Sequence, residues 1–200
     1  LQVANLAEMG ALEIGANALL IRAGAIYHDI GKLNNPMYFI ENQSSILNPH
    51  NKIDFDESAS IIINHVLDGI EIAKENNLPD ELIDFIRTHH GTTTVEYFYK
   101  QFITNFPEGE IDIRSFTYPG PKPHSKETAI LMMADAAEAS ARSLRNPNED
   151  NIDALIEDVI NKQVQQDQFV NANITFKEIT QLKKLFKKRL VNIHHARVEY

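Results

Sequence analysis

Residues 27 to 32 read Tyr27-His28-Asp29-Ile30-Gly31-Lys32. A single His-Asp pair carries little information, because such pairs arise often by chance. Here the pair opens an ordered series of histidines and acids spread over separate helical segments, in a chain without cysteine. Such imidazole and carboxylate groups suit a hard-to-borderline divalent metal ion. The series predicts a metal site at the meeting of several helices, with these ligands: His28, Asp29, His65, His89, His90 and Asp135.

Composition bounds the class of protein. With 200 residues, of which 43% are hydrophobic, the chain can bury about 70% of its unfolded surface, enough for one well-packed domain. A net charge of −9 argues against binding to a nucleic-acid polymer or to an anionic membrane, since both need a basic face. No apolar stretch reaches the roughly 18 residues expected of a membrane span. We therefore expect the chain itself to be soluble.

Helical periodicity dominates the sequence, and no segment shows the alternation of a strand. Capping signals sharpen several boundaries: Asp54 with Glu57 and Thr175 with Glu178 form capping boxes, Ser125 is a further N-cap, and Gly91 ends a helix. The pattern predicts an all-α bundle of about seven or eight helices. The expected helices cover residues 2–15, 17–28, 54–75, 79–90, 95–105, a segment beginning after 125, and 175–195. Two long irregular segments, 34–53 and 107–124, are expected to form the walls of an active cleft.

Several longer motifs accompany the His-Asp series. They are Val3-Ala-Asn-Leu-Ala-Glu8, His28-Asp-Ile-Gly-Lys32, Tyr38-Phe-Ile-Glu-Asn-Gln43, Asn48-Pro-His50, Gly120-Pro-Lys-Pro-His-Ser-Lys-Glu127 and Ala134-Asp-Ala-Ala-Glu-Ala-Ser-Ala-Arg-Ser-Leu144. As a set they resemble the HD superfamily of metal-dependent phosphohydrolases, and within it the HD domain of the seven-transmembrane HD phosphodiesterases, the PgpH type. The resemblance covers roughly residues 1 to 195.

The resemblance implies where this domain belongs. Residues 1–200 would form one HD phosphohydrolase domain of a larger membrane protein, on the cytoplasmic face of the cell membrane. The membrane would be reached only through a region outside this chain, and a homodimer stays open. The family pattern also has a histidine ahead of a run like Leu1-Gln2-Val3; we expect that ligand to precede Leu1.

The resemblance further implies the reaction. Relatives of this type hydrolyse cyclic di-AMP to linear pApA, by attack of a metal-bound hydroxide at a binuclear divalent centre. Ligation by nitrogen and oxygen alone fits iron or manganese best, and leaves zinc and cobalt open. Asp29 would hold both ions, and Lys32 would neutralise a phosphate oxygen. Lys32 could equally be a solvated lysine at a helix end.

Other residues of the two irregular segments and of the helix after them are candidates for substrate binding. Lys122 and Ser125 could bind a phosphate near a helix N-terminus. Tyr38 and Tyr118, with Phe39, could stack on adenine or plug the core instead. Arg142 could reach phosphate or pair with Glu138. His50 and His124 are left out of the metal shell.

Each proposed ligand also has a plainer interpretation. His28 and Asp29 could cap a helix before Gly31, and an isolated His65 could be a hydrogen-bonded core residue. A helix dipole could account for one of the histidines at 89 and 90, and an arginine pair for Asp135. The pair His194-His195 has no carboxylate at ligand spacing and is interpreted as a helix end, outside the metal site.

Three rival functions stay open. A cyclic di-GMP phosphodiesterase of the HD-GYP kind would follow its His-His pair with glutamate and a nearby Gly-Tyr-Pro, whereas here Gly91-Thr-Thr-Thr94 follows. A nucleoside triphosphate hydrolase would need a denser basic clamp. A nucleotide-binding regulatory module without turnover is the third.

Overall fold

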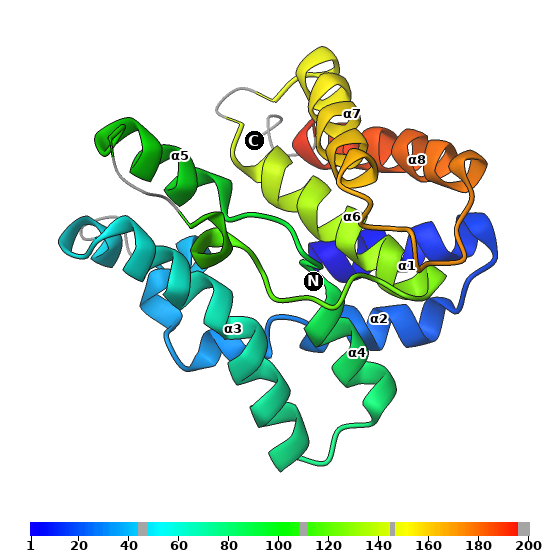
Figure 1. The fold of residues 1–200 in the computed structure, drawn as a ribbon. Coiled ribbons are helices and arrows are strands. Elements are labelled where there is room, and N and C mark those ends of the chain that lie inside the picture. The colour runs from blue at the N-terminus through cyan, green and yellow to red at the C-terminus, as the bar shows by residue number, and fades with distance from the viewer. Residues whose placement is uncertain (44–47, 109–111, 145–146, 196–200) are drawn as a thin grey trace. The chain divides into compact units, whose positions relative to one another are not determined.

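The computed structural model describes residues 1–43, 48–108, 112–144 and 147–195, apart from the side chains of residues 194 and 195. Every regular element in these ranges is helical, so the all-α prediction is confirmed. The α-helices are α1 (Gln2–Ile14), α2 (Ala18–Tyr27), α3 (Phe55–Glu75), α4 (Asp80–Thr88), α5 (Glu96–Asn105), α6 (Lys126–Arg142), α7 (Glu149–Gln165) and α8 (Phe176–His195) (Figure 1). None of these helices is both long and apolar enough for a transmembrane segment in the part of the chain that is described.

Helix α7 was missed by the sequence analysis. It begins after Asn148, whose side chain accepts a hydrogen bond from the backbone N–H of Asn151 in a reciprocal capping box. Its apolar side chains Ile152, Ile156 and Ile160 recur every four residues and are fully buried. This is the spacing of one helix face, so the signal was present in the sequence.

The predicted caps have mixed outcomes. Ser125 accepts a hydrogen bond from the backbone N–H of Thr128, and Glu178 accepts one from the backbone N–H of Thr175, as expected. Asp54 occupies the N-cap position of α3, but its side chain makes no capping hydrogen bond, so the capping box predicted there is wrong. Helix α4 ends at Thr88, with Gly91 in the left-handed conformation at φ 51° shortly after it.

The chain divides into two compact units. The first contains residues 1–26 and 122–200, in which α1, α6, α7 and α8 pack together. Helix α6 is the centre of this unit, because the run from Thr128 to Ala134 is buried without interruption. The apolar faces of α1, α7 and α8 cover it, including Ala7, Ile156 and Phe186.

The second unit contains residues 27–121. Helix α3 is its longest element, and α4, α5 and five short 3₁₀ helices pack on it or on one another: η1 (Ile30–Leu33), η2 (Pro36–Tyr38), η3 (Ile40–Asn42), η4 (Pro49–Lys52) and η5 (Ile113–Phe116). Two apolar clusters support it, one around Ala73, Ile83 and Ile86 and one around Ala59, Phe98 and Phe116. The irregular segments predicted at 34–53 and 107–124 are therefore partly 3₁₀-helical.

Candidate metal centre

Gly31 sets the position of the His-Asp pair. A Cβ atom at this residue would lie 1.9 Å from the carbonyl oxygen of His65 and 2.4 Å from the backbone nitrogen of Gly69, both on α3. No side chain fits there, so glycine lets η1 pack directly on the α3 backbone. Because Asp29 comes just before η1, the same contact brings its carboxylate to His65.

Four predicted ligands of the second unit converge around Asp29. Its Oδ1 lies 3.4 Å from Nε2 of His65 and 3.6 Å from Nε2 of His89, and its Oδ2 lies 3.2 Å from Nε2 of His28. One nitrogen each of His65, His89 and His90 lie within 4.8 Å of one another. The second unit therefore brings the His-Asp pair together with the histidines at 65, 89 and 90, and their ligation of a metal ion stays a prediction.

The hydrogen bonds of two histidines fix their tautomers. Nδ1 of His65 donates to the carbonyl of Ile62 at 2.5 Å, and Nδ1 of His89 donates to the carbonyl of Ile86 at 2.7 Å. In neutral rings the Nε2 atoms then carry lone pairs, as metal ligation requires. These two Nε2 atoms face each other at 3.1 Å. Facing lone pairs repel unless a cation, either a proton or a metal ion, lies between them.

Asp29 makes the metal ion the better explanation. Its Oδ1 is buried and accepts no hydrogen bond of normal length from any described residue. A buried carboxylate oxygen without a donor is costly. Two ligand atoms at right angles, about 2.1 Å from an ion, are about 3.0 Å apart, close to the observed separations of 3.1 to 3.6 Å. The donors fit a divalent ion.

Protonation states agree with this fit. Burial raises the pKa of Asp29, but the attraction of His28 and of Lys32 outweighs it and holds the pKa well below its usual value. Burial lowers the pKa of His90, and the neighbouring His89 and His65 lower it further, well below the ordinary value. The site therefore offers an ionised carboxylate and a neutral imidazole at neutral pH, which are the forms that bind metal.

Lys32 is tied to this centre. Its Nζ lies 2.7 Å from Oδ2 of Asp29 and 2.6 Å from Oε1 of Glu41, and its side chain is only 20% exposed. Burial lowers the pKa of Lys32, but the two carboxylates outweigh this and raise it. The alternative of a solvated lysine is therefore wrong. Glu41 was missed by the sequence analysis, although it lies within the quoted motif 38–43.

Aromatic rings enclose the histidines. Phe39 is buried and meets His65 edge-on, with ring centroids 5.6 Å apart, and Nζ of Lys32 lies 5.1 Å from the Phe39 centroid. Tyr118 is buried and stacks on His90 at 4.2 Å. An isolated antiparallel β-bridge pairs Thr94 with Thr117, the residue directly before Tyr118. Tyr38 is half-buried beside His50. Stacking of Tyr38 and Tyr118 on adenine stays a prediction.

The remaining predicted site residues belong to the first unit. Asp135 is half-buried on α6, and its ligation stays a prediction. Arg142 lies 3.6 Å from Glu138, the pairing that was left open. The hydroxyl of Ser125 accepts the capping hydrogen bond at the start of α6, and Nζ of Lys122 donates to the carbonyl of Gln166. Their roles in substrate binding stay predictions, and the side chains of His194 and His195 lie outside the described residues.

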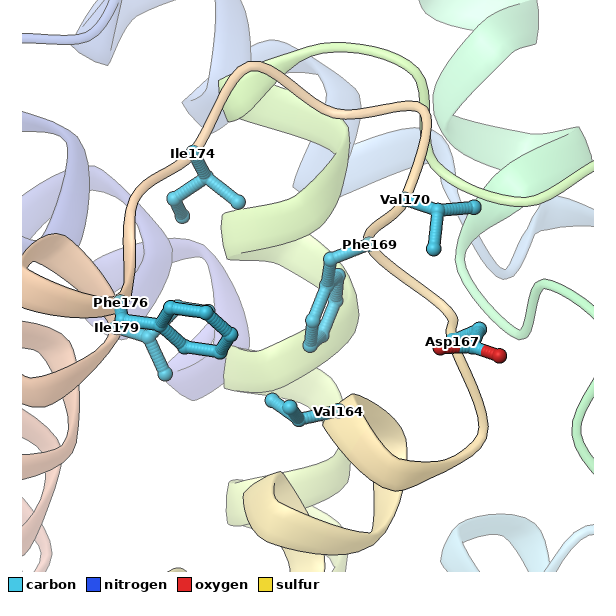
Figure 2. A pocket seen from close by; sticks show the side chains of 7 residues that line it. All are labelled: Val164, Asp167, Phe169, Val170, Ile174, Phe176 and Ile179. Carbon is cyan, nitrogen blue, oxygen red and sulfur yellow. The ribbon is translucent and has the colours of Figure 1, made fainter.

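The first unit contains a pocket whose lining differs chemically from the candidate metal centre of the second unit. Figure 2 shows its lining, which contains one carboxylate and six apolar side chains: Asp167, Val164, Phe169, Val170, Ile174, Phe176 and Ile179. None of the predicted site residues is among them.

Comparison with known proteins agrees with this geometry. The HD domain family matches residues 1–140. The cyclic-di-AMP phosphodiesterase PgpH of Bacillus subtilis (strain 168) is 43% identical over 198 residues, which are 99% of this chain and 28% of that protein. PgpH of Listeria monocytogenes serotype 1/2a (strain 10403S) is also 43% identical, over all of this chain and 28% of that protein. The chain thus spans little more than a quarter of these relatives.

A solved structure extends the comparison. The crystal structure of the L. monocytogenes phosphodiesterase PgpH HD domain in complex with cyclic-di-AMP is similar with a TM-score of 0.92 and 41% identity. The match covers 96% of this chain and 89% of that one. With its His-Asp pair and three converging histidines, this chain belongs to the HD domain family.

Proposed function

We propose that this chain is a metal-dependent phosphodiesterase domain that hydrolyses cyclic di-AMP to linear pApA. The observation that carries the proposal is the buried Oδ1 of Asp29, which faces two imidazole nitrogens whose rings are locked in the ligating tautomer. The similarity to an HD domain solved with cyclic di-AMP supports the choice of substrate.

The residues divide the work as follows. His28, Asp29, His65, His89 and His90 would hold divalent metal, and Asp135 is a further ligand that we propose. Bound divalent ions supply a water nucleophile that is reactive at neutral pH and polarise the phosphodiester. Iron or manganese suits this set of nitrogen and oxygen donors best.

Lys32 has a separate role in the proposal. Its raised pKa keeps it an ammonium ion across the physiological range. Held by Asp29 and Glu41, it presents a fixed positive charge at the edge of the centre. It would bind a non-bridging phosphate oxygen, and its charge would count most as negative charge builds up in the transition state.

We also propose that the chain is one domain of a longer, membrane-attached protein and works on the cytoplasmic side. The relatives of which it spans 28% support the greater length. Attachment can be checked by following the full protein through membrane fractionation, and self-association by sedimentation of this chain.

Metal reconstitution tests the main proposal. Protein stripped with a chelator is reloaded with manganese, with iron(II) under anaerobic conditions or with zinc, and cyclic di-AMP and pApA are followed by chromatography. We expect pApA to appear after reloading with manganese or iron and to be absent from the stripped protein. Tight binding of cyclic di-AMP with no product under any metal would contradict the proposal and point to a regulatory module.

A further inference from the structure

Residues 38–43 enclose the candidate metal centre, and a residue outside this segment holds its backbone in place. Residues 38–43 supply Phe39, whose ring meets His65, and Glu41, whose carboxylate holds Lys32. Neither of these residues belongs to α3, which carries His65, or to α4, which ends directly before His89 and His90. Something else must fix the backbone at the beginning of this segment.

His50 provides that fixation. Its Nε2 lies 2.9 Å from the carbonyl oxygen of Tyr38, the residue directly before Phe39. Because a carbonyl only accepts, Nε2 must carry the proton and donate. The hydrogen bond joins η4 to the end of η2, two elements that also contact each other.

The His50 ring is held on both sides. It meets Tyr38 with centroids 5.1 Å apart and Phe98 of α5 with centroids 4.8 Å apart. The backbone N–H of His50 donates to Oδ1 of Asn48, which also accepts from the side-chain amide of Gln43. The ring thus connects the segment to the Phe98 cluster of the second unit.

Nδ1 of His50 adds an independent sign. It is buried and has no hydrogen-bond partner among the described residues. A buried acceptor without a hydrogen bond is costly, so packing alone does not favour histidine here. The hydrogen bond made by the opposite nitrogen is the gain that offsets this cost.

We propose that His50 is a positioning residue: through Tyr38 it holds Phe39 and Glu41 in place, and thereby fixes Lys32 for phosphate binding. The inference rests on the proposed function. It separates two parts of the site, because the ligands Asp29 and His65 are placed by the η1–α3 contact at Gly31 and not by His50. Loss of His50 should weaken phosphate binding while metal binding persists.

Two isosteric substitutions test the hydrogen bond. The amide nitrogen of glutamine can reach the position of Nε2, whereas asparagine reaches only that of Nδ1. In manganese-loaded protein we expect His50→Asn to raise KM for cyclic di-AMP about tenfold with full manganese content, and His50→Gln to stay within about twofold of the native KM. If His50→Gln is as impaired as His50→Asn, or if His50→Asn loses manganese, the inference is overturned.

A second variant distinguishes loss of this hydrogen bond from simple misfolding. Glu41→Gln removes the contact with Lys32 without touching His50. The KM of the double variant Glu41→Gln/His50→Asn should be no higher than that of the more impaired single variant, because both substitutions act through Lys32. If the losses of the two single variants add in the double variant, this route is contradicted.

The outcome stays separable from the substrate assignment. Affinity for inorganic phosphate is measured by calorimetry on the same manganese-loaded proteins, and the same tenfold pattern is expected there. If the native chain and the variants show this pattern of phosphate affinities but the native chain cleaves no cyclic di-AMP, the proposed function fails and the role of His50 stands. Equal phosphate affinity in all variants overturns the role of His50.

Discussion

We predict that metal binding depends on Asp29. The pKa of its carboxyl is held well below the usual value, so the side chain stays ionised, and its buried Oδ1 has no donor among the described residues. Asp29→Asn keeps the size of the side chain and removes the charge. We expect manganese content, measured by elemental analysis, to fall below about a tenth of the native value, with cyclic di-AMP hydrolysis down at least about 100-fold.

A matched surface change checks that prediction. Asp112 is an acid whose pKa is lowered by hydrogen bonds from Arg114, but it lies on the surface, outside the cluster. Asp112→Asn should leave manganese content unchanged. Native manganese content in Asp29→Asn would refute the assignment of Asp29 as a ligand.

At the residue scale, the sequence predicted which side chains come together better than it predicted their surroundings. An ordered set of histidines and acids is visible in one dimension, so His65, His89 and His90 could be named. Glu41 could not, because a single glutamate in an irregular segment gives no sign of which lysine it faces. The tautomers of His65 and His89 depend on carbonyl positions and need coordinates.

At the scale of elements, the contact of η1 with α3 organises the second unit. In Gly31→Ala the new methyl group would overlap backbone atoms of His65 and Gly69, and backbone cannot move aside as a flexible side chain can. We expect unfolding by urea to show a loss of about 3 kcal/mol, together with loss of bound manganese.

Gly15 supplies the control for this change. It has φ 70° and nothing within 4 Å of an added Cβ. Gly15→Ala should cost only the backbone strain of about 1 kcal/mol and leave manganese bound. If Gly31→Ala is no more destabilising than Gly15→Ala, the close approach of η1 and α3 is wrong.

The ion pair between α6 and α8 gives a pH-dependent prediction. The hydrogen bond from Lys126, with that from the Thr175 backbone, lowers the pKa of Glu178 from 4.5 to about 2. A lowered carboxyl pKa adds stability above pH 4.5, which is lost as the pH falls through about 2.

Glu178→Gln retains the α8 capping box and removes the charge. At pH 7 it should lower the free energy of unfolding by about 1 kcal/mol after allowance for solvent screening. The difference from the native chain should shrink as the pH falls below 4.5 towards 2. A difference that is independent of pH in thermal unfolding would contradict the ion pair.

Helices with clear amphipathic patterns were predicted nearly to the residue, while α7 was overlooked in spite of its capping box and isoleucine spacing. The 3₁₀ helices between 30 and 52 could not be predicted, because they are stabilised by packing on α3 and on one another rather than by local propensity. Lys32 and Glu41 lie in these short elements, and Phe39 lies between two of them. The unpredicted part of the fold therefore includes much of the second unit's site.

For the whole molecule, the all-α class followed from the sequence, and the relatives place it in the HD domain family. The division into two compact units, one built from both ends of the chain, was not predicted. It depends on contacts between residues far apart in sequence. Asp135 and the histidine cluster belong to different units, so joint ligation of one centre remains a prediction.

Substrate preference belongs to this scale as well. The segment after His90 reads Gly91-Thr92-Thr93-Thr94 and lacks the motif of cyclic di-GMP enzymes. Guanine reverses the donor and acceptor pattern of adenine at one base edge, so a site that binds one base by hydrogen bonds rejects the other. We expect kcat/KM for cyclic di-AMP to exceed that for cyclic di-GMP at least about tenfold; the reverse order would reassign the substrate.

The most direct test of the account is a crystal of the manganese-loaded chain, measured for anomalous scattering at the manganese edge. The account predicts a strong peak bounded by Asp29, His65, His89 and His90. A map without an anomalous peak among these side chains, from protein shown by elemental analysis to contain manganese, would contradict it.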